Sequence, residues 1–101
     1  MPVRKRAHER IAILLPPFAS AKQHRELGAF ARYCILRVER ELGQREAWTV
    51  NIAPERGSYT SRIAVRDRGA VLEEQGTGYD GALATWEAIC KLEQRMREQR
   101  L

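Results

Sequence analysis

Basic side chains recur on one side of a long amphipathic stretch, residues 20–43, which has the 3.6-residue period of a helix. Tyr33 and Leu36 lie among them. The basic residues of this side are Lys22, Arg25, Arg32 and Arg40. Because cationic groups neutralise phosphates and aromatic rings stack on bases, such a face is suited to docking on RNA. A solvated face with salt bridges inside the helix, such as Arg37 with Glu41, explains the same pattern equally well.

Four further basic residues are predicted to point away from the core and are candidates for RNA contacts. Two lie on a predicted strand and two on the last helix: Arg62, Arg66, Lys91 and Arg95. A purely structural role for Lys91 is also available, because it can form an ion pair with Glu87, four residues earlier on the helix. The net charge of +5 favours a polyanionic partner or an acidic protein surface, although plain solubility accounts for it as well.

Residues for catalysis or metal binding are not grouped in this sequence. His8 and His24 are not at ligand spacing from a cysteine or a carboxylate cluster, so the pattern predicts no zinc site. Gly76-Thr-Gly78 is a weak match to a nucleotide-binding loop. Glu73 and Glu74 adjoin in a predicted strand, so they point to opposite faces and cannot act as a carboxylate pair. We therefore expect a protein that is not an enzyme and needs no cofactor.

Three short runs of alternating apolar and polar residues predict an antiparallel meander. These runs are 48–52, 59–65 and 70–74. Turn residues at 54–57 and 67–69 separate the runs, and Gly76-Thr-Gly-Tyr-Asp80 is expected to end the strand pattern before a helix over about 80–97. Ile11–Leu15 predicts a further short strand, which the first helix would connect to a parallel neighbour.

The predicted fold is α+β, in the order β-α-β-β-β-α, with two helices packed on one face of a small, mostly antiparallel four-stranded sheet. Ser20 and Gln23 form a capping box, Gly43 stops the first helix, and Asp80 caps the last one. The first helix is predicted to bury Leu27, Phe30, Ala31, Cys34, Ile35, Val38 and Leu42. The last helix is predicted to bury Ala82, Trp86, Ile89, Leu92 and Met96. If Trp86 lies in the core, Trp86→Ala is expected to lower the free energy of unfolding by about 3–5 kcal/mol.

The length of 101 residues predicts a single α+β domain over residues 10–101, after a flexible basic segment at 1–9. The apolar run at 11–15 is shorter than a signal-peptide core, and no run is long enough to span a membrane, so we expect a cytoplasmic protein. Cys34 and Cys90 are expected to be buried, reduced thiols; a bridge between the two helices is the alternative.

Residues 48–95 also carry a resemblance to a known family. The relevant runs are Thr49–Ile52, Arg56-Gly57, Ser61–Val65 and Val71–Glu74, followed by Asp80, Ala84 and Lys91-Leu-Glu93. In these runs the chain resembles the bacterial ribosome hibernation-promoting factors and ribosome-associated inhibitors. It departs from them at Ala82 and Trp86, where that family has a tyrosine and an acidic residue. Lys91 is the one basic residue that matches a family motif.

The resemblance implies binding to ribosomal RNA on the small ribosomal subunit through basic side chains on the helices, which would block translation in resting cells. The favoured hypothesis is therefore a non-enzymatic RNA- and ribosome-binding protein. The alternative is a protein-interaction module that uses the open sheet face or a sheet edge. The sequence leaves the oligomeric state open.

Overall fold

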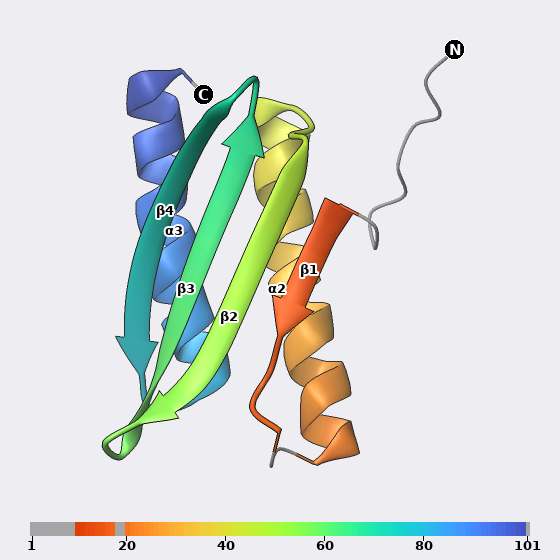
Figure 1. The fold of residues 1–101 in the computed structure, drawn as a ribbon, viewed down its shortest axis with the longest axis vertical. Coiled ribbons are helices and arrows are strands. Elements are labelled where there is room, and N and C mark those ends of the chain that lie inside the picture. The colour runs from red at the N-terminus through yellow and green to blue at the C-terminus, as the bar shows by residue number, and fades with distance from the viewer. Residues whose placement is uncertain (1–9, 18–19, 101) are drawn as a thin grey trace.

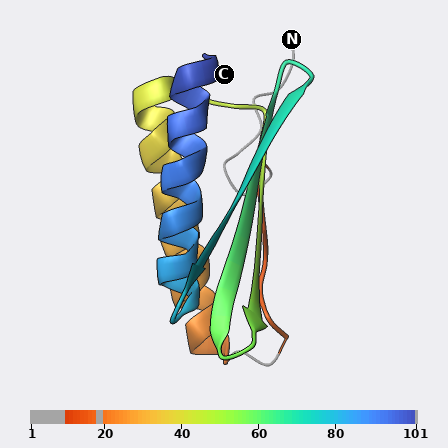
Figure 2. The ribbon, with the colours of Figure 1, turned by 90° about the vertical axis from the view of Figure 1, so that its left-hand side faces the viewer.

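The computed structural model describes residues 10–17 and 20–100, which form a four-stranded sheet with both helices on one face (Figures 1 and 2). In chain order the elements are β1 (Ile11–Leu14), α2 (Ala21–Leu42), β2 (Ala47–Glu55), β3 (Ser58–Asp67), β4 (Ala70–Gly78) and α3 (Gly81–Gln99). The strands lie in the order β1-β2-β3-β4; β1 is parallel to β2, and the other neighbours are antiparallel. The predicted fold is confirmed. The predicted flexible segment 1–9 lies outside the described residues.

The loop of each hairpin consists of an Arg-Gly pair. Arg56 and Gly57 have φ angles of 47° and 82°, and Arg68 and Gly69 have 52° and 80°. Two successive residues with positive φ are characteristic of a type I′ turn, whose twist matches that of the flanking strands. Because these loops contain only two residues, β2, β3 and β4 pair along their whole lengths and are longer than predicted.

β4 continues past its predicted end at Glu74 as far as Gly78. The break expected at Gly76 was wrong, because both glycines pair with β3 in regular register. Glycine serves here to let α3 approach the sheet. A Cβ atom on Gly76 would lie 2.3 Å from the carbonyl oxygen of Ala84 and 2.5 Å from the amide nitrogen of Ala88.

The core lies between the inner face of the sheet and the two helices. The predicted stripe of α2 is confirmed, with Ala31, Cys34, Ile35 and Val38 buried and Leu27, Phe30 and Leu42 packed around them. The sheet contributes Trp48, Val50, Ile52, Ile63 and Val65. The predicted caps also form: Ser20 and Gln23 make the capping box, and the Asp80 side chain accepts a hydrogen bond from the amide of Leu83.

The assignment of Trp86 to the core was wrong. Trp86 is 43% exposed, and α3 instead buries the small residues Ala84, Thr85 and Ala88 beside Ile89. The reason is the close approach at β4, where only short side chains fit between helix and strand. Trp86 is thereby turned from the sheet toward α2, so the large destabilisation expected for a core ring does not apply.

The two cysteines differ in burial. Cys34 is buried, and burial raises the pKa of its thiol to about 11. Cys90 is exposed, which corrects the expectation that both are buried. Both are free thiols, as expected.

Gly76→Ala is expected to destabilise the protein by about 1–3 kcal/mol, because its Cβ would overlap the backbone of α3. Gly28→Ala is the matched control. A Cβ there would meet only the Arg32 Nη1 atom at 3.7 Å, and alanine favours the helix by about 1 kcal/mol. Urea unfolding of the two variants measures both effects. Equal midpoints for Gly76→Ala and the parent would contradict the close packing of α3.

Candidate nucleic-acid interface

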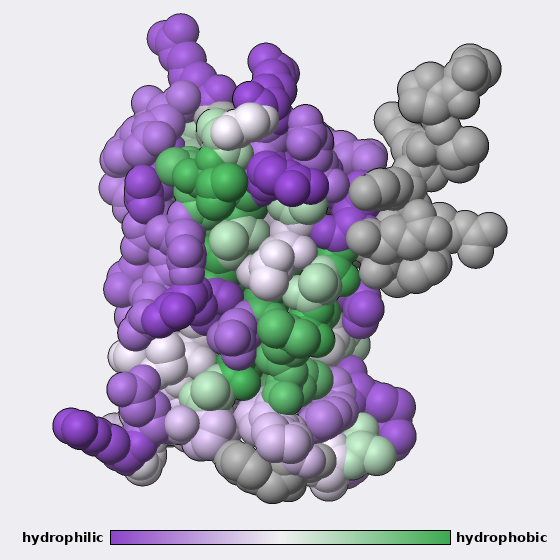
Figure 3. All heavy atoms as spheres, viewed as in Figure 1, coloured by the Kyte–Doolittle hydropathy of each residue, from purple (hydrophilic) through white to green (hydrophobic). Residues whose placement is uncertain are grey.

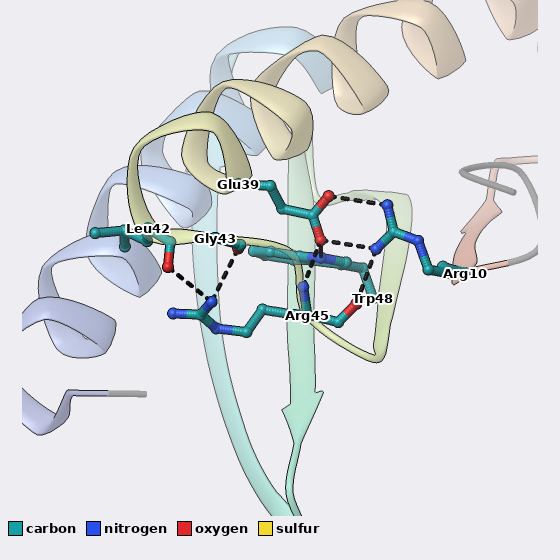
Figure 4. A network of polar contacts seen from close by, with 6 residues as sticks. All are labelled: Arg10, Glu39, Leu42, Gly43, Arg45 and Trp48. Atoms are coloured by element: carbon teal, nitrogen blue, oxygen red, sulfur yellow. Dashed lines mark hydrogen bonds and ion pairs between the residues drawn. The ribbon is translucent and has the colours of Figure 1, made fainter. Parts of the chain in front are cut away.

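A buried ion pair fixes the C-terminal half of α2 to the sheet (Figure 4). Arg10 donates to Glu39 through two nitrogens, Nη1 to Oε2 at 2.7 Å and Nη2 to Oε1 at 2.9 Å. The Oε2 atom of Glu39 also accepts from the Trp48 indole and from the Arg45 amide, each at 2.9 Å. Both charged side chains are only 7% exposed. This network orients α2 and was not predicted, because its partners are distant in sequence.

Burial raises the pKa of Glu39, but hydrogen bonds from Arg10, Arg45 and Trp48 outweigh it, so the pKa lies below its usual range. The pKa of Glu93 is lowered in the same way. Burial raises this pKa, and hydrogen bonds from Arg97 and Arg37 more than offset the effect of burial.

These shifts predict acid sensitivity. A carboxylate with a lowered folded-state pKa contributes stability above its ordinary value of 4.5 and loses it as the pH falls through the folded-state pKa. The urea midpoint should therefore decrease when the pH is lowered from about 6 to about 3. Glu39→Gln should show a shallower decrease than the parent over this range. Parallel profiles for the two proteins would show that Glu39 does not contribute this pH dependence.

The outer face of α2 carries guanidinium groups without acidic partners. Among the described residues, no carboxylate lies within 4.0 Å of Arg25, Arg32 or Arg40. Lys22 lies 3.9 Å from Glu26, and both side chains are strongly exposed, so this pair is weak. Arg25 and Arg32 are two turns apart, about 10 Å along the helix. Arg25 and Arg40 are exposed and Arg32 is partly buried, so α2 presents positive charge that no carboxylate of the described residues neutralises.

Acids and bases pair across the helix–helix contact instead. Arg37 Nη2 lies 3.0 Å from Glu93 Oε1, and Arg97 pairs with both Glu93 and Glu41. The Arg37–Glu41 pair suggested by helical spacing does not form, because α3 brings Glu93 to Arg37. The guanidinium of Arg37 also lies over the ring of Trp86, 5.3 Å from its centroid.

The open face of the sheet has mixed charge. Arg62 and Arg66 point outward as predicted, but Arg62 Nε lies 3.3 Å from Glu73 and Arg66 Nε lies 3.9 Å from Glu46. Figure 3, which looks onto this face, shows hydrophobic residues between hydrophilic margins. Charge pairing therefore leaves this face less suited to phosphates than α2.

Lys91 and Arg95 bind the outer edge of β4. Lys91 Nζ donates to the carbonyl oxygen of Gln75 at 3.1 Å, and Arg95 Nη1 donates to that of Glu73 at 3.0 Å. Each also pairs with an acid, Lys91 with Glu87 at 3.1 Å and Arg95 with Glu74 at 2.7 Å. An edge strand with occupied backbone groups resists pairing with another chain. The spacing of residues 87, 91 and 95 along one side of α3 was the available signal for this role.

The eight predicted RNA-binding residues therefore occupy three separate places. Lys22, Arg25, Arg32 and Arg40 share α2, Arg62 and Arg66 lie on the open sheet face, and Lys91 and Arg95 lie along the edge of β4. Sequence reasoning also missed exposed Arg56 in the first hairpin and the contact between Arg37 and Trp86. Within residues 10–17 and 20–100, no three metal-ligating side chains gather, and no helix is apolar and long enough to cross a membrane.

The order β-α-β-β-β-α, with both helices on one face of the sheet, defines a class of small α+β proteins that includes solved structures. One is a ribosomal subunit interface protein from Coxiella burnetii, with a TM-score of 0.72 and 14% identity over 89% of this chain and 96% of that one. Another is the N-terminal domain of Protein Y from Thermus thermophilus, with a TM-score of 0.69 and 15% identity over 87% and 93% of the two chains. No family model and no curated protein matches the sequence. The resemblance noted in residues 48–95 is thus confirmed as a likeness of fold.

Proposed function

We propose that this protein is a cytoplasmic, non-enzymatic factor that binds ribosomal RNA on the small ribosomal subunit and silences translation in resting cells. The observation that carries the proposal is the outer face of α2, where Arg25, Arg32 and Arg40 have no acidic partner among the described residues. Support comes from the shared fold, because one protein of that fold is named for the ribosomal subunit interface.

The proposed mechanism is electrostatic and needs no cofactor. Arginines on α2 would neutralise phosphates and release their counterions, which makes the affinity depend on salt. Arg25 and Arg32 are about 10 Å apart, so they would contact different phosphates and follow the shape of the RNA rather than its sequence. The Arg10–Glu39 ion pair would hold α2 in place against the sheet while it binds.

Sedimentation of the tagged protein with separated ribosomal subunits tests the proposal. We expect the protein to move with the small subunit at about 50 mM salt and to dissociate progressively toward about 200 mM. The large subunit is the control and should carry little protein. A protein that stays at the top of the gradient with both subunits at low salt would contradict the proposal, as would binding that is insensitive to salt.

A second candidate is a protein-interaction module on the open sheet face. One observation favours it: Leu14 and Val71 are 57% and 59% exposed on this face. The edge of β4 is a poor alternative site, because Lys91 and Arg95 occupy its carbonyl groups. Leu14→Lys combined with Val71→Lys separates the candidates. We expect this variant to sediment with the small subunit as the parent does; loss of binding would assign the contact to the sheet face.

A further inference from the structure

Trp86 is presented at the surface in a fixed position. Its side chain is 43% exposed, although indole rings contribute most when they are buried. The guanidinium of Arg37 lies 5.3 Å from the ring centroid and is held by Glu93 at 3.0 Å. A cation over the indole face stabilises this arrangement, so α2 and α3 together hold the ring in place.

A second exposed ring lies on the same side of the helix pair. Tyr33 is 60% exposed and precedes Arg37 by one turn of α2. Arg40, which has no acidic partner among the described residues, lies two turns from Tyr33 on the same side of that helix. We call Tyr33, Arg37 and Trp86 the aromatic platform. Of the arginines on α2 that have no acidic partner among the described residues, Arg40 lies nearest to this platform.

We propose that the aromatic platform stacks an unpaired RNA base, with Trp86 as the main stacking residue. Base–aromatic stacking is typical of single-stranded recognition, and phosphate neutralisation by nearby arginines accompanies it. Bases inside a duplex are already stacked, so the platform would select unpaired nucleotides. Arg37 is neutralised by Glu93, but the positive charge of Arg40 beside the rings favours a nucleic acid over an apolar protein segment.

This inference deepens the proposed function by naming the nucleotide chemistry that the helix face would recognise. It also has an independent test, because short RNA can be titrated without ribosomes. The protein has two tryptophans, and Trp48 is 1% exposed, so contact with RNA should change the fluorescence of Trp86 alone.

The probe is a single-stranded 12-nucleotide oligoadenylate at low salt, compared with a 12-base-pair RNA duplex. We expect the single strand to quench the parent's tryptophan fluorescence and the duplex to leave it unchanged. Trp86→Leu should abolish the quenching and weaken single-strand affinity by about 5- to 100-fold. Trp86→Phe should retain part of the affinity, because a smaller ring still stacks.

Leu83→Ala is the matched control, since Leu83 is another exposed apolar residue of α3, at 51%. It should bind the single strand as the parent does. Equal affinities for Trp86→Leu and the parent would overturn the inference, as would equal quenching by single strand and duplex. If Trp86→Leu loses ribosome binding but keeps its oligonucleotide affinity, the platform contacts a protein and the inference is also overturned. If only the ribosome sedimentation of the parent fails, the proposed function is wrong while the stacking result stands.

Discussion

Arg25→Glu combined with Arg32→Glu is expected to weaken binding to the small ribosomal subunit by about 100-fold or more and to leave the protein folded. Each charge-assisted contact to a phosphate contributes about 1.5–3 kcal/mol, and each reversal adds repulsion. The slope of log affinity against log salt should also become shallower by roughly one unit per lost phosphate contact. Sedimentation across a salt series measures both quantities.

Folding should be unaffected, because neither arginine supports the core. Arg25 is exposed and Arg32 is partly buried beside the buried stripe of α2, but neither belongs to the core, and neither has an acidic partner among the described residues. The free energy of unfolding should therefore change by less than about 1 kcal/mol. Circular dichroism and urea unfolding check this requirement before binding is compared.

The matched control is Arg62→Glu with Arg66→Glu, which changes the net charge equally on the open sheet face. We expect this control to retain most of the binding, because both arginines already pair with acids there. Reversal of Glu73 should have little effect or strengthen binding slightly. Equal losses in the two double variants would mean that net charge, rather than the face of α2, determines binding.

Glu39→Ala is expected to lower the free energy of unfolding by about 3–5 kcal/mol. The substitution leaves the buried guanidinium of Arg10 without its two acceptors and removes the acceptor of the Trp48 indole. A buried charge that has lost its partner costs far more than an exposed one. For a domain whose stability is about 5–15 kcal/mol, such a loss leaves a substantial unfolded fraction on heating.

Glu41→Ala is the control for this prediction. Glu41 lies two residues away on α2 and pairs with Arg97 at the surface, where both side chains are 50% exposed. An exposed pair contributes about 0–1 kcal/mol, so this variant should unfold close to the parent. A double variant, Arg10→Met with Glu39→Leu, should be more stable than the sum of its single changes predicts. Additive losses would contradict a buried, coupled pair.

The features that the sequence predicted correctly are those set by neighbouring residues. Ser20 and Gln23 cap α2 across one turn, and Asp80 does the same for α3. Alternation along each strand defined which side chains of the meander face the core, since a period of two admits only two arrangements. Helical periodicity likewise placed Arg25 and Arg40 on the exposed side of α2, whereas Arg32 is partly buried; that these arginines bind RNA stays a prediction.

Tertiary structure decided what depends on residues far apart in the chain. Trp86 faces outward because Gly76 brings β4 against Ala84 and Ala88, and no pattern within α3 contains that information. Arg10 is buried because Glu39, twenty-nine residues away, accepts from it.

Lys91 and Arg95 likewise donate hydrogen bonds to carbonyl groups of β4. The pattern of residues within α3 contains no information about these contacts, because their acceptors lie on another element. The sequence alone thus determined the order of the elements, their caps and the charged face of α2. The packing of α3 onto β4 decided that Lys91 and Arg95 support the fold and that Trp86 is exposed to solvent. Side-chain partners depend on distances that only the folded chain defines.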